Sequence, residues 1–271
     1  MFFHAHPDDE SIFTGGTIAR LARDGWVVVL VVATGGELGL PPVAGGAAPV
    51  VFGDGPGTSE RRMAETRRAA GLLGVARVEF FGYHDSGMLG DPANHAAGSF
   101  WTADTEAVAR RLAVLLTDAG AAALVVYDEA GIYGHPDHVQ VHRAGVRAAE
   151  LAGLAALYES TVDREYLHFV ETHLVTEAGV GVVGVGGGGG RGDLDVPLGL
   201  AASPVGVPTV LVSTTVDVRD VLDLKRAAMA AHASQIPETA SAMRLPAAAF
   251  GAVYGYEWFV RRGPSGPIET L

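Results

Sequence analysis

The chain has 271 residues, 48% of them hydrophobic, and a formal net charge of −12 at pH 7. This length predicts one large domain or two small ones, and the acidic balance argues against nucleic acid as a partner. The complete lack of cysteine excludes disulfides, thiolate metal ligands and a cysteine nucleophile.

Apolar runs alternate with helical patterns along the first 151 residues. Strands are expected at 1–4, 26–33, 78–81 and 122–127, and helices at 14–24, 58–73, 103–118 and 138–151. The near-continuous apolar run at 26–33 is typical of a strand buried on both faces of a parallel sheet. Residues 38–57, rich in Gly, Pro and Ala, are expected to form a long loop. The alternation predicts an α/β fold with a mostly parallel sheet and helices on both faces.

The pattern after residue 151 is weaker. A strand is expected at 157–169, another at 209–213, a helix at 218–231 and a closing strand at 254–260. The Gly-rich stretch 179–192 predicts a surface loop, since it lacks the Lys-Ser/Thr ending of a phosphate-binding loop. We interpret residues 1–271 as one domain, in which 1–151 form the α/β half and 152–271 form an elaboration that completes the site.

Two polar clusters follow predicted strands. Residues 4–10 read HAHPDDE after the first strand, and residues 134–138 read GHPDH in the loop after the fourth. Such a concentration of carboxylates is costly to bury unless a positive charge holds it together. Because ligands bind beyond the carboxyl ends of parallel strands, we expect the two clusters to meet around one metal ion.

The ligands expected for that ion are His6, Asp9 and His138. Imidazole and carboxylate are the groups that Zn²⁺ accepts in the absence of thiolate, and Fe²⁺ accepts the same set. The first two residues come from one turn, and the third is distant in the chain. The alternative is a polar turn whose acids cap the first helix, and a second cluster after another parallel strand disfavours it.

Three further residues of the clusters are candidates for proton transfer. Asp8 is a candidate general base that takes a proton from the attacking water. His135 is expected to stabilise an oxyanion or protonate a leaving amine, and Asp137 to orient His135 by accepting its other N–H. The residues expected to have supporting or structural roles are His4, Glu10 and His142.

Residues 5–10 (AHPDDE) and 133–138 (YGHPDH) resemble the LmbE/PIG-L family of zinc-dependent N-acetylglucosaminyl deacetylases. The segments that resemble its actinobacterial branch, which handles mycothiol, are 34–37, 62–65, 85–88 and 231–235. The resemblance is strong over about residues 1–150 and weak beyond them.

The resemblance implies a Rossmann-like three-layer sandwich and hydrolysis of an amide on an amino sugar. Carried over by position, it implies zinc ligation by His6, Asp9 and His138. It implies Asp8 as the base, and His135 as the oxyanion stabiliser or acid with Asp137 behind it. The residues it implies as substrate contacts or aids to catalysis are Glu37, Arg62, Asp85 and Tyr133.

We therefore expect metal-dependent removal of an N-acyl group, N-acetyl above all, from a glucosamine-containing small molecule. The alternatives are an amidase acting on mycothiol conjugates, a deacylase of an antibiotic glycoside, and a non-catalytic sugar-binding module, against which Asp8 argues.

No apolar run reaches the ~18 residues of a membrane span and no signal peptide is visible, so we expect a cytoplasmic protein without a membrane partner. The oligomeric state stays open, a homo-oligomer included.

Overall fold

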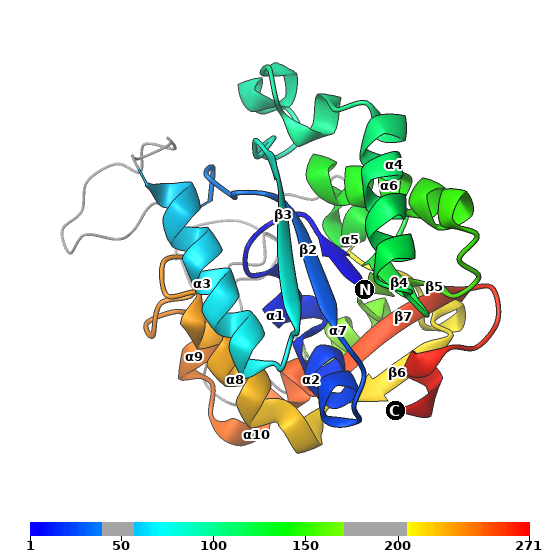
Figure 1. The fold of residues 1–271 in the computed structure, drawn as a ribbon. Helices are drawn as coiled ribbons and strands as arrows, with labels where there is room; N and C mark the ends of the chain where they lie inside the picture. The colour runs from blue at the N-terminus through cyan, green and yellow to red at the C-terminus, as the bar shows by residue number, and fades with distance from the viewer. Residues whose placement is uncertain (40–56, 171–204) are drawn as a thin grey trace.

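The computed structural model describes residues 1–39, 57–170 and 205–271 (Figure 1). The Gly-rich stretch 179–192 and most of the expected loop 38–57 lie outside these residues. Within the three described stretches, no helix is long and apolar enough to cross a membrane.

The described strands form one seven-stranded sheet in the order β3-β2-β1-β4-β5-β7-β6. The parallel strands are β1 (Phe2–His4), β2 (Val29–Thr34), β3 (Arg77–Tyr83), β4 (Leu124–Tyr127) and β5 (Leu157–Thr161). β7 (Tyr256–Arg262) runs antiparallel to both β5 and β6 (Thr214–Asp217). The prediction of a mostly parallel sheet is confirmed.

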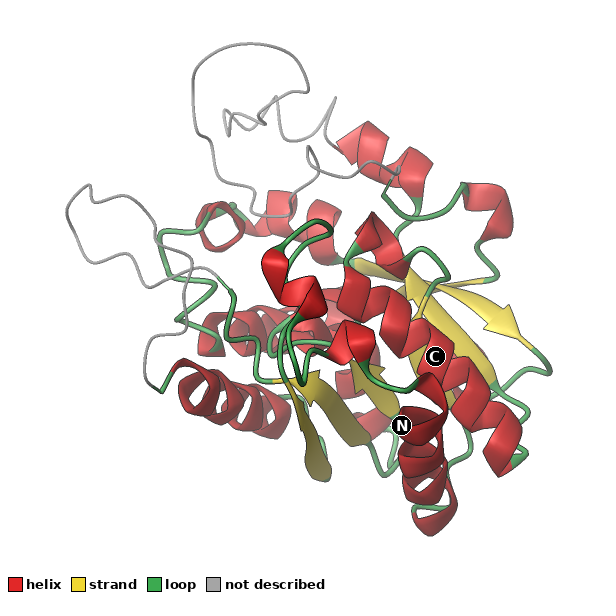
Figure 2. Ribbon diagram, turned by 90° about the horizontal axis from the view of Figure 1, so that it is seen from above, coloured by secondary structure: helices red, strands yellow, loops and turns green. Residues whose placement is uncertain are grey.

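Helices cover both faces of this sheet, as Figures 1 and 2 show. One face packs against α4 (Thr105–Asp118) and α6 (Pro136–Ala152). The other packs against α2 (Gly15–Arg23), α3 (Thr58–Leu72) and α8 (Leu222–Ala231). The shorter helices are α1 (Asp9–Phe13), α5 (Gly131–Gly134), α7 (Arg164–Phe169), α9 (Ser241–Arg244) and α10 (Ala247–Tyr254).

The alternation of side chains along the central strands explains why both faces need covering. Phe2 contributes to the core under α2, α3 and α8, whereas Phe3 contributes to the core under α4 and α6. In β2, Val31 and Val32 divide between the two cores in the same way. Since successive residues of a strand point to opposite faces, a strand between two helical layers must be apolar throughout.

The expected strand at 157–169 is only half correct. β5 ends at Thr161, and residues 164–169 form α7 instead. Asp163 begins this helix, because its side chain accepts a hydrogen bond from the backbone N–H of Tyr166 at 3.0 Å. An N-cap of this kind favours a helix over continued extension.

Other boundaries also differ from the predictions. Thr209–Leu211 is a 3₁₀ turn with Val210 87% exposed, so the predicted strand at 209–213 is wrong and β6 begins at Thr214. The predicted closing strand is β7, which lies inside the sheet with β6 at the edge. β2 begins at Val29 rather than residue 26, since Trp26 and Val27 lie before the strand and are exposed.

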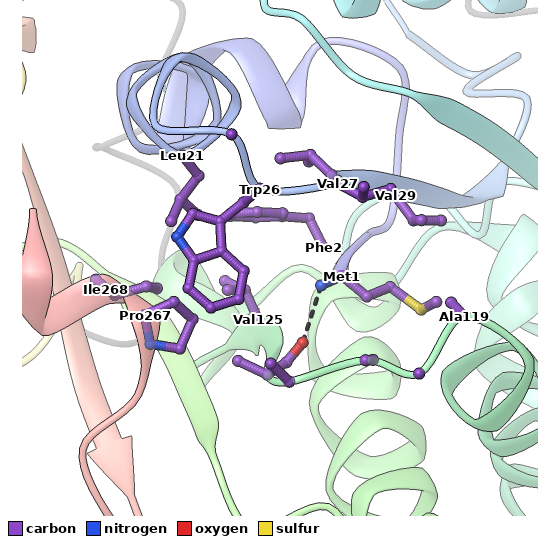
Figure 3. Close-up of a pocket in the computed structure, with 16 residues that line it drawn as sticks. Met1, Phe2, Leu21, Trp26, Val27, Val29, Ala119, Val125, Pro267 and Ile268 are labelled. Carbon is purple, nitrogen blue, oxygen red and sulfur yellow. Dashed lines mark hydrogen bonds between the residues drawn. The ribbon is translucent and has the colours of Figure 1, made fainter.

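A cavity of about 360 Å³ lies where β1, β2 and β4 begin (Figure 3). Its lining includes Met1, Trp26, Val125, Pro267 and Ile268, and none of its lining side chains is titratable. This recess is lined by apolar side chains and lies at the amino ends of the strands, whereas the two polar clusters follow the carboxyl ends. It is therefore not a candidate for the chemistry predicted above.

Candidate active site

The order of the strands creates a crevice at the end of β1. From β1 the chain moves outward through β2 and β3, and then returns to place β4 on the other side of β1. Loops that leave neighbouring strands in opposite directions open a binding crevice at their carboxyl ends. The first polar cluster follows β1, and the second follows β4 through α5. The two clusters therefore lie at the switch point of the sheet.

The two clusters meet, as predicted. The ring centroid of His6 lies 4.5 Å from that of His135 and 5.3 Å from that of His138. Asp9 Oδ2 lies 3.3 Å from His6 Nδ1 and 3.4 Å from His138 Nε2. These three side chains are buried. One carboxylate oxygen thus lies near one nitrogen of each imidazole, and imidazole and carboxylate are groups that bind Zn²⁺ in proteins.

Two sets of described residues bring all of their ligand atoms within 4.8 Å of one another, and Asp9 belongs to neither. One is His6, His135 and His138, and the other is His6, Asp85, His135 and Asp137. His135 belongs to both sets, but its Nδ1 accepts the backbone N–H of Asp137 at 3.1 Å, so the neutral ring carries its proton on Nε2. A protonated nitrogen donates a hydrogen bond and does not ligate a metal. This favours Asp9 over His135 as the third ligand.

Asp137 does not lie where the sequence predicted. Its carboxylate accepts the Ser86 N–H at 2.9 Å and lies 3.2 Å from His6 Nε2, while only its backbone N–H meets His135. The expectation that its carboxylate orients His135 is wrong. The reason is helical geometry, because His135 is the N-cap of α6 and Asp137 turns back towards the strand ends.

The donor set fits a divalent cation. If His6 Nε2–H donates to Asp137, His6 Nδ1 faces the Asp9 carboxylate at 3.3 Å, and either a proton or a metal ion between the two atoms satisfies both. Burial lowers the pKa of His6, but Asp85 and Asp137 raise it well above its ordinary value. Burial likewise raises the pKa of Asp9, but His138 and His6 hold it well below its usual range. The pocket thus favours positive charge beside an ionised carboxylate.

Asp8 occupies an unusual backbone conformation beside this set. Its φ of 106° lies in the left-handed region, which costs a non-glycine residue about 1–2 kcal/mol. Its N–H donates to Glu10 Oε2 at 3.1 Å, and its Oδ2 lies 3.1 Å from Arg62 Nη2. Burial raises the pKa of Asp8 to about 6, while Arg62 opposes the rise. This carboxyl group is paired with Arg62 and has a pKa close to neutrality.

The four expected substrate contacts surround the cluster. Tyr133 Oη lies 3.5 Å from His138 Nε2, and Asp85 Oδ1 lies 3.6 Å from His6 Nε2. Glu37 Oε1 accepts the Asp85 N–H at 3.1 Å, and its buried Oε2 has no hydrogen-bond partner among the described residues. Arg62 donates to the carbonyl of Pro7 at 2.7 Å. All four residues therefore lie near the histidines, at the carboxyl ends of the parallel strands.

His4 and His142, for which a supporting or structural role was expected, have hydrogen-bond partners within the fold. Both ring nitrogens of His4 are satisfied, by Tyr127 Oη and Thr14 Oγ1, each at 2.9 Å. His142 Nδ1 lies 3.0 Å from the carbonyl oxygen of Tyr127. Both structural assignments agree with the sequence prediction.

Three residues of the site were not singled out from the sequence. Tyr127 stacks on His138 with centroids 4.1 Å apart, and Ser86 contacts both carboxylate oxygens of Asp137. His232 Nε2 lies 2.6 Å from Glu10 Oε1. The only signal for His232 was its place in the segment 231–235, which resembles the mycothiol branch.

A comparison with family models matches residues 1–149 to PIG-L, described as GlcNAc-PI de-N-acetylase. Two relatives carry the name 1D-myo-inositol 2-acetamido-2-deoxy-alpha-D-glucopyranoside deacetylase. The protein from Thermobifida fusca is 34% identical over 98% of this chain and 96% of its own. The protein from Thermobispora bispora is 37% identical over 98% of this chain and 89% of its own.

Solved structures share the fold at low sequence identity. The N,N'-diacetylchitobiose deacetylase from Pyrococcus horikoshii has a TM-score of 0.52 and 21% identity, over 88% of this chain and 70% of its own. The A40926 pseudoaglycone deacetylase has a TM-score of 0.57 and 16% identity, over 96% of each chain. At these identities the comparison supports the α/β fold and nothing finer.

Proposed function

This chain belongs to the PIG-L family, and from that premise we propose that it is a metal-dependent hydrolase that removes an N-acetyl group from a glucosamine-containing small molecule. The observation that most supports the proposal is the convergence of His6, Asp9 and His138 beside Asp8 and His135. The relatives named above are deacetylases of an acetamido-glucopyranoside joined to inositol, which makes GlcNAc-inositol the first substrate to test.

We assign His6, Asp9 and His138 as the ligands of Zn²⁺, with Fe²⁺ as the alternative ion. When bound, the ion supplies a Lewis acid for the acyl carbonyl and lowers the pKa of water to ~7. Asp137 contributes by accepting the Nε2 proton of His6, which turns the lone pair of Nδ1 towards Asp9.

Asp8 acts as the general base. Its carboxylate accepts a proton from the water that attacks the amide carbon, and a pKa of about 6 leaves it ionised at neutral pH yet basic enough to accept that proton. Arg62 holds this carboxylate in place through a contact of 3.1 Å between its Nη2 and Asp8 Oδ2.

His135 and Tyr133 stabilise the negative charge that develops on the acyl oxygen. Burial lowers the pKa of His135 well below its ordinary value, so the ring is neutral and donates from Nε2. Burial also raises the pKa of Tyr133, which keeps its hydroxyl protonated and able to donate. The proton that Asp8 accepted then moves to the amine nitrogen as the C–N bond breaks, which returns Asp8 to its ionised form, while His135 keeps its N–H as a donor to the acyl oxygen. Two donors beside a buried reaction centre stabilise an oxyanion more strongly than water does.

Arg62, Asp85 and Glu37 are the residues we assign to the sugar. The free Oε2 of Glu37 and the Asp85 carboxylate are acceptors that pair with hydroxyl groups, because each hydroxyl is a donor. A buried acceptor that waits for a ligand hydroxyl gives strong discrimination against an analogue without that hydroxyl.

The test is release of acetate by the purified chain, with and without added Zn²⁺ or Fe²⁺. The panel contains GlcNAc-inositol, free N-acetylglucosamine, N,N'-diacetylchitobiose and a mycothiol conjugate. Stoichiometric acetate and amine from an N-acetylglucosaminyl compound support the proposal. Cleavage of the conjugate alone would assign the amidase alternative, and binding without turnover on all four compounds would contradict hydrolysis.

A further inference from the structure

Glu10 and His232 form a buried acid–base contact that the proposed mechanism does not use. His232 Nε2 lies 2.6 Å from Glu10 Oε1, and the two side chains are 222 residues apart in the sequence. Glu10 is completely buried and His232 is 1% exposed. A carboxylate enclosed in this way needs a donor, and this histidine from the end of α8 supplies one.

The second oxygen of Glu10 leads directly to Asp8. Glu10 Oε2 accepts the backbone N–H of Asp8, the residue with φ 106°. On the other side, Arg62 Nη2 donates to the carbonyl of Pro7 and contacts Asp8 Oδ2. The strained residue is therefore held through its backbone by Glu10 and through its carboxylate by Arg62.

The turn that carries His232 is itself attached to the helix that carries Arg62. Ser234 donates from its backbone N–H and its hydroxyl to the carboxylate of Glu65, three residues after Arg62 in α3. The backbone N–H groups of Gln235 and Ile236 both bond to the carbonyl of His232. The turn 232–236 thus contacts Glu10 directly and, through Glu65, the helix that carries Arg62.

We propose that Glu10 and His232 are positioning residues that hold Asp8 in its left-handed conformation, so that the C-terminal part of the chain sets the geometry of a base contributed by the N-terminal motif. This inference rests on the proposed function, because the pair acts through Asp8. A purely structural pair on the same helix provides the comparison. Lys225 of α8 lies 2.6 Å from Glu257 and is equally buried, but neither contacts Asp8.

The first experiment compares three variants for acetate release from GlcNAc-inositol, zinc content and thermal unfolding. His232→Ala removes the donor to Glu10 and is expected to lower kcat by about 10²-fold, with KM within about twofold and zinc content unchanged. His232→Gln keeps an N–H donor and is expected to recover most of kcat. Lys225→Met is expected to lower Tm without lowering kcat. Equal loss of kcat in Lys225→Met and His232→Ala would overturn the proposal.

The second experiment asks whether the effect passes through Asp8. In an Asp8→Ala background, His232→Ala is expected to cause no further loss of kcat, because coupled residues are not additive. An undiminished additional loss would overturn the positioning role. The crystal structure of zinc-loaded His232→Ala gives a readout independent of turnover. Asp8 is expected to leave positive φ or lose its contact with Arg62, and an unchanged Asp8 would contradict the proposal.

These results separate the inference from the function on which it rests. If Asp8→Ala retains wild-type turnover, the assignment of the base fails, whatever the His232 variants do. If Asp8→Ala is inactive while His232→Ala leaves kcat and the Asp8 conformation unchanged, the base assignment stands and only the positioning role fails.

Discussion

Asp8 carries two costs that an aspartate on the surface avoids. Its left-handed backbone costs about 1–2 kcal/mol, and its carboxyl group is largely buried beside another carboxylate. Arg62 offsets part of the second cost, and Glu10 satisfies the N–H that the strained conformation exposes. Asp8 and Ile132 are the two non-glycine residues with positive φ in the described part of the chain. Asp8 directly precedes α1, and Ile132 lies in the short helix α5 that leads to the second polar cluster.

Replacement of Asp8 tests its assignment as the base. Asp8→Ala is expected to lower kcat by about 10²–10⁴-fold, because general base catalysis contributes about that much. Zinc content, measured by mass spectrometry, should stay near one ion per chain, since Asp8 is not among the assigned ligands. Turnover close to that of the unmodified chain would contradict the mechanism.

Replacement of His138 should have the opposite profile. His138→Ala removes one of three assigned ligands and leaves His6 and Asp9, so zinc content and activity should be lost together. His95→Ala is the matched control, because His95 is exposed and lies far from the cluster in sequence. Retention of a full equivalent of zinc by His138→Ala would favour another ligand set, with His135 as the residue to replace next.

At the scale of elements, the first turn of α6 determines what the second cluster does. Pro136 lies at the first helical position, and His135 caps the helix through Nδ1. The cap leaves Nε2 of His135 as a donor, while Asp137 and His138 in the first turn face His6 and Asp9. The helix start thus separates a hydrogen-bond donor, His135, from a proposed metal ligand, His138, only three residues away.

Asp137→Asn distinguishes the observed contact from the predicted one. Because the carboxylate faces His6, loss of its charge is expected to weaken zinc affinity by about 10–100-fold, as measured by competition with a chelator. His135→Ala should lower kcat with unchanged zinc affinity. If Asp137→Asn leaves zinc affinity intact and lowers only kcat, Asp137 acts on His135 after all.

The carboxyl group of Glu159 in β5 makes stability depend on pH. Burial raises the pKa of Glu159 from 4.5 to about 7, although Arg262 opposes the rise. The folded chain then binds more protons than the unfolded chain between these values, so this group removes stability as pH increases from 4.5 to 7. His142, Asp128 and Glu129 also face it.

Glu159→Gln should remove that pH dependence. The variant is expected to unfold at the same temperature as the unmodified chain near pH 4.5, and at a higher temperature at pH 8, because a neutral amide has no charge to bury. Thermal unfolding across this range measures the difference. A loss at pH 8 would show that the ion pair with Arg262 outweighs burial, and a gain that is constant with pH would show that titration of Glu159 is not its cause.

At the scale of the whole molecule, the candidate site needs both parts of the chain. Its proposed ligands come from the loop after β1 and from the first turns of α1 and α6, and α8 packs against α1, α2 and α3. Lys225 of α8 pairs with Glu257 of β7, whose carboxylate also accepts the N–H groups of Gly16 and Thr17 at the start of α2. Metal binding at the switch point should therefore stabilise the whole fold.

Removal of the metal should lower the unfolding temperature. Zinc at about 100 times its Kd contributes about 2.7 kcal/mol of stability, and a chain of this size shifts by about 2–4 °C per kcal/mol. A chelator is thus expected to lower Tm by about 5–10 °C, and added Zn²⁺ to restore it. The Asp8→Ala variant loaded with zinc should show the same decrease in Tm when the chelator is added, whereas His138→Ala should show no decrease.

The sequence by itself determined the parallel core and the two polar clusters. Both follow from local rules, because a strand buried on both faces must be apolar, and parallel strands bring their carboxyl ends to one edge. That was enough to predict that His6, Asp9 and His138 would meet. Three features could not be predicted: the end of β5 before α7, the turn at 209–211 and the position of β6 at the edge of the sheet. In such short segments, helix caps and pairing with neighbouring strands determine the structure more than hydrophobic periodicity does.

Only the tertiary structure decided which partner each polar residue takes. Asp137 turns to His6 rather than His135 because α6 begins between them, and Glu10 finds His232 because α8 folds back over α1. Hydrogen bonds depend on direction over about 3 Å, and sequence spacing specifies no direction once the partners lie 100 or more residues apart. The opening motif therefore supplies the chemistry, and the rest of the chain determines how Asp8 and its neighbours are held.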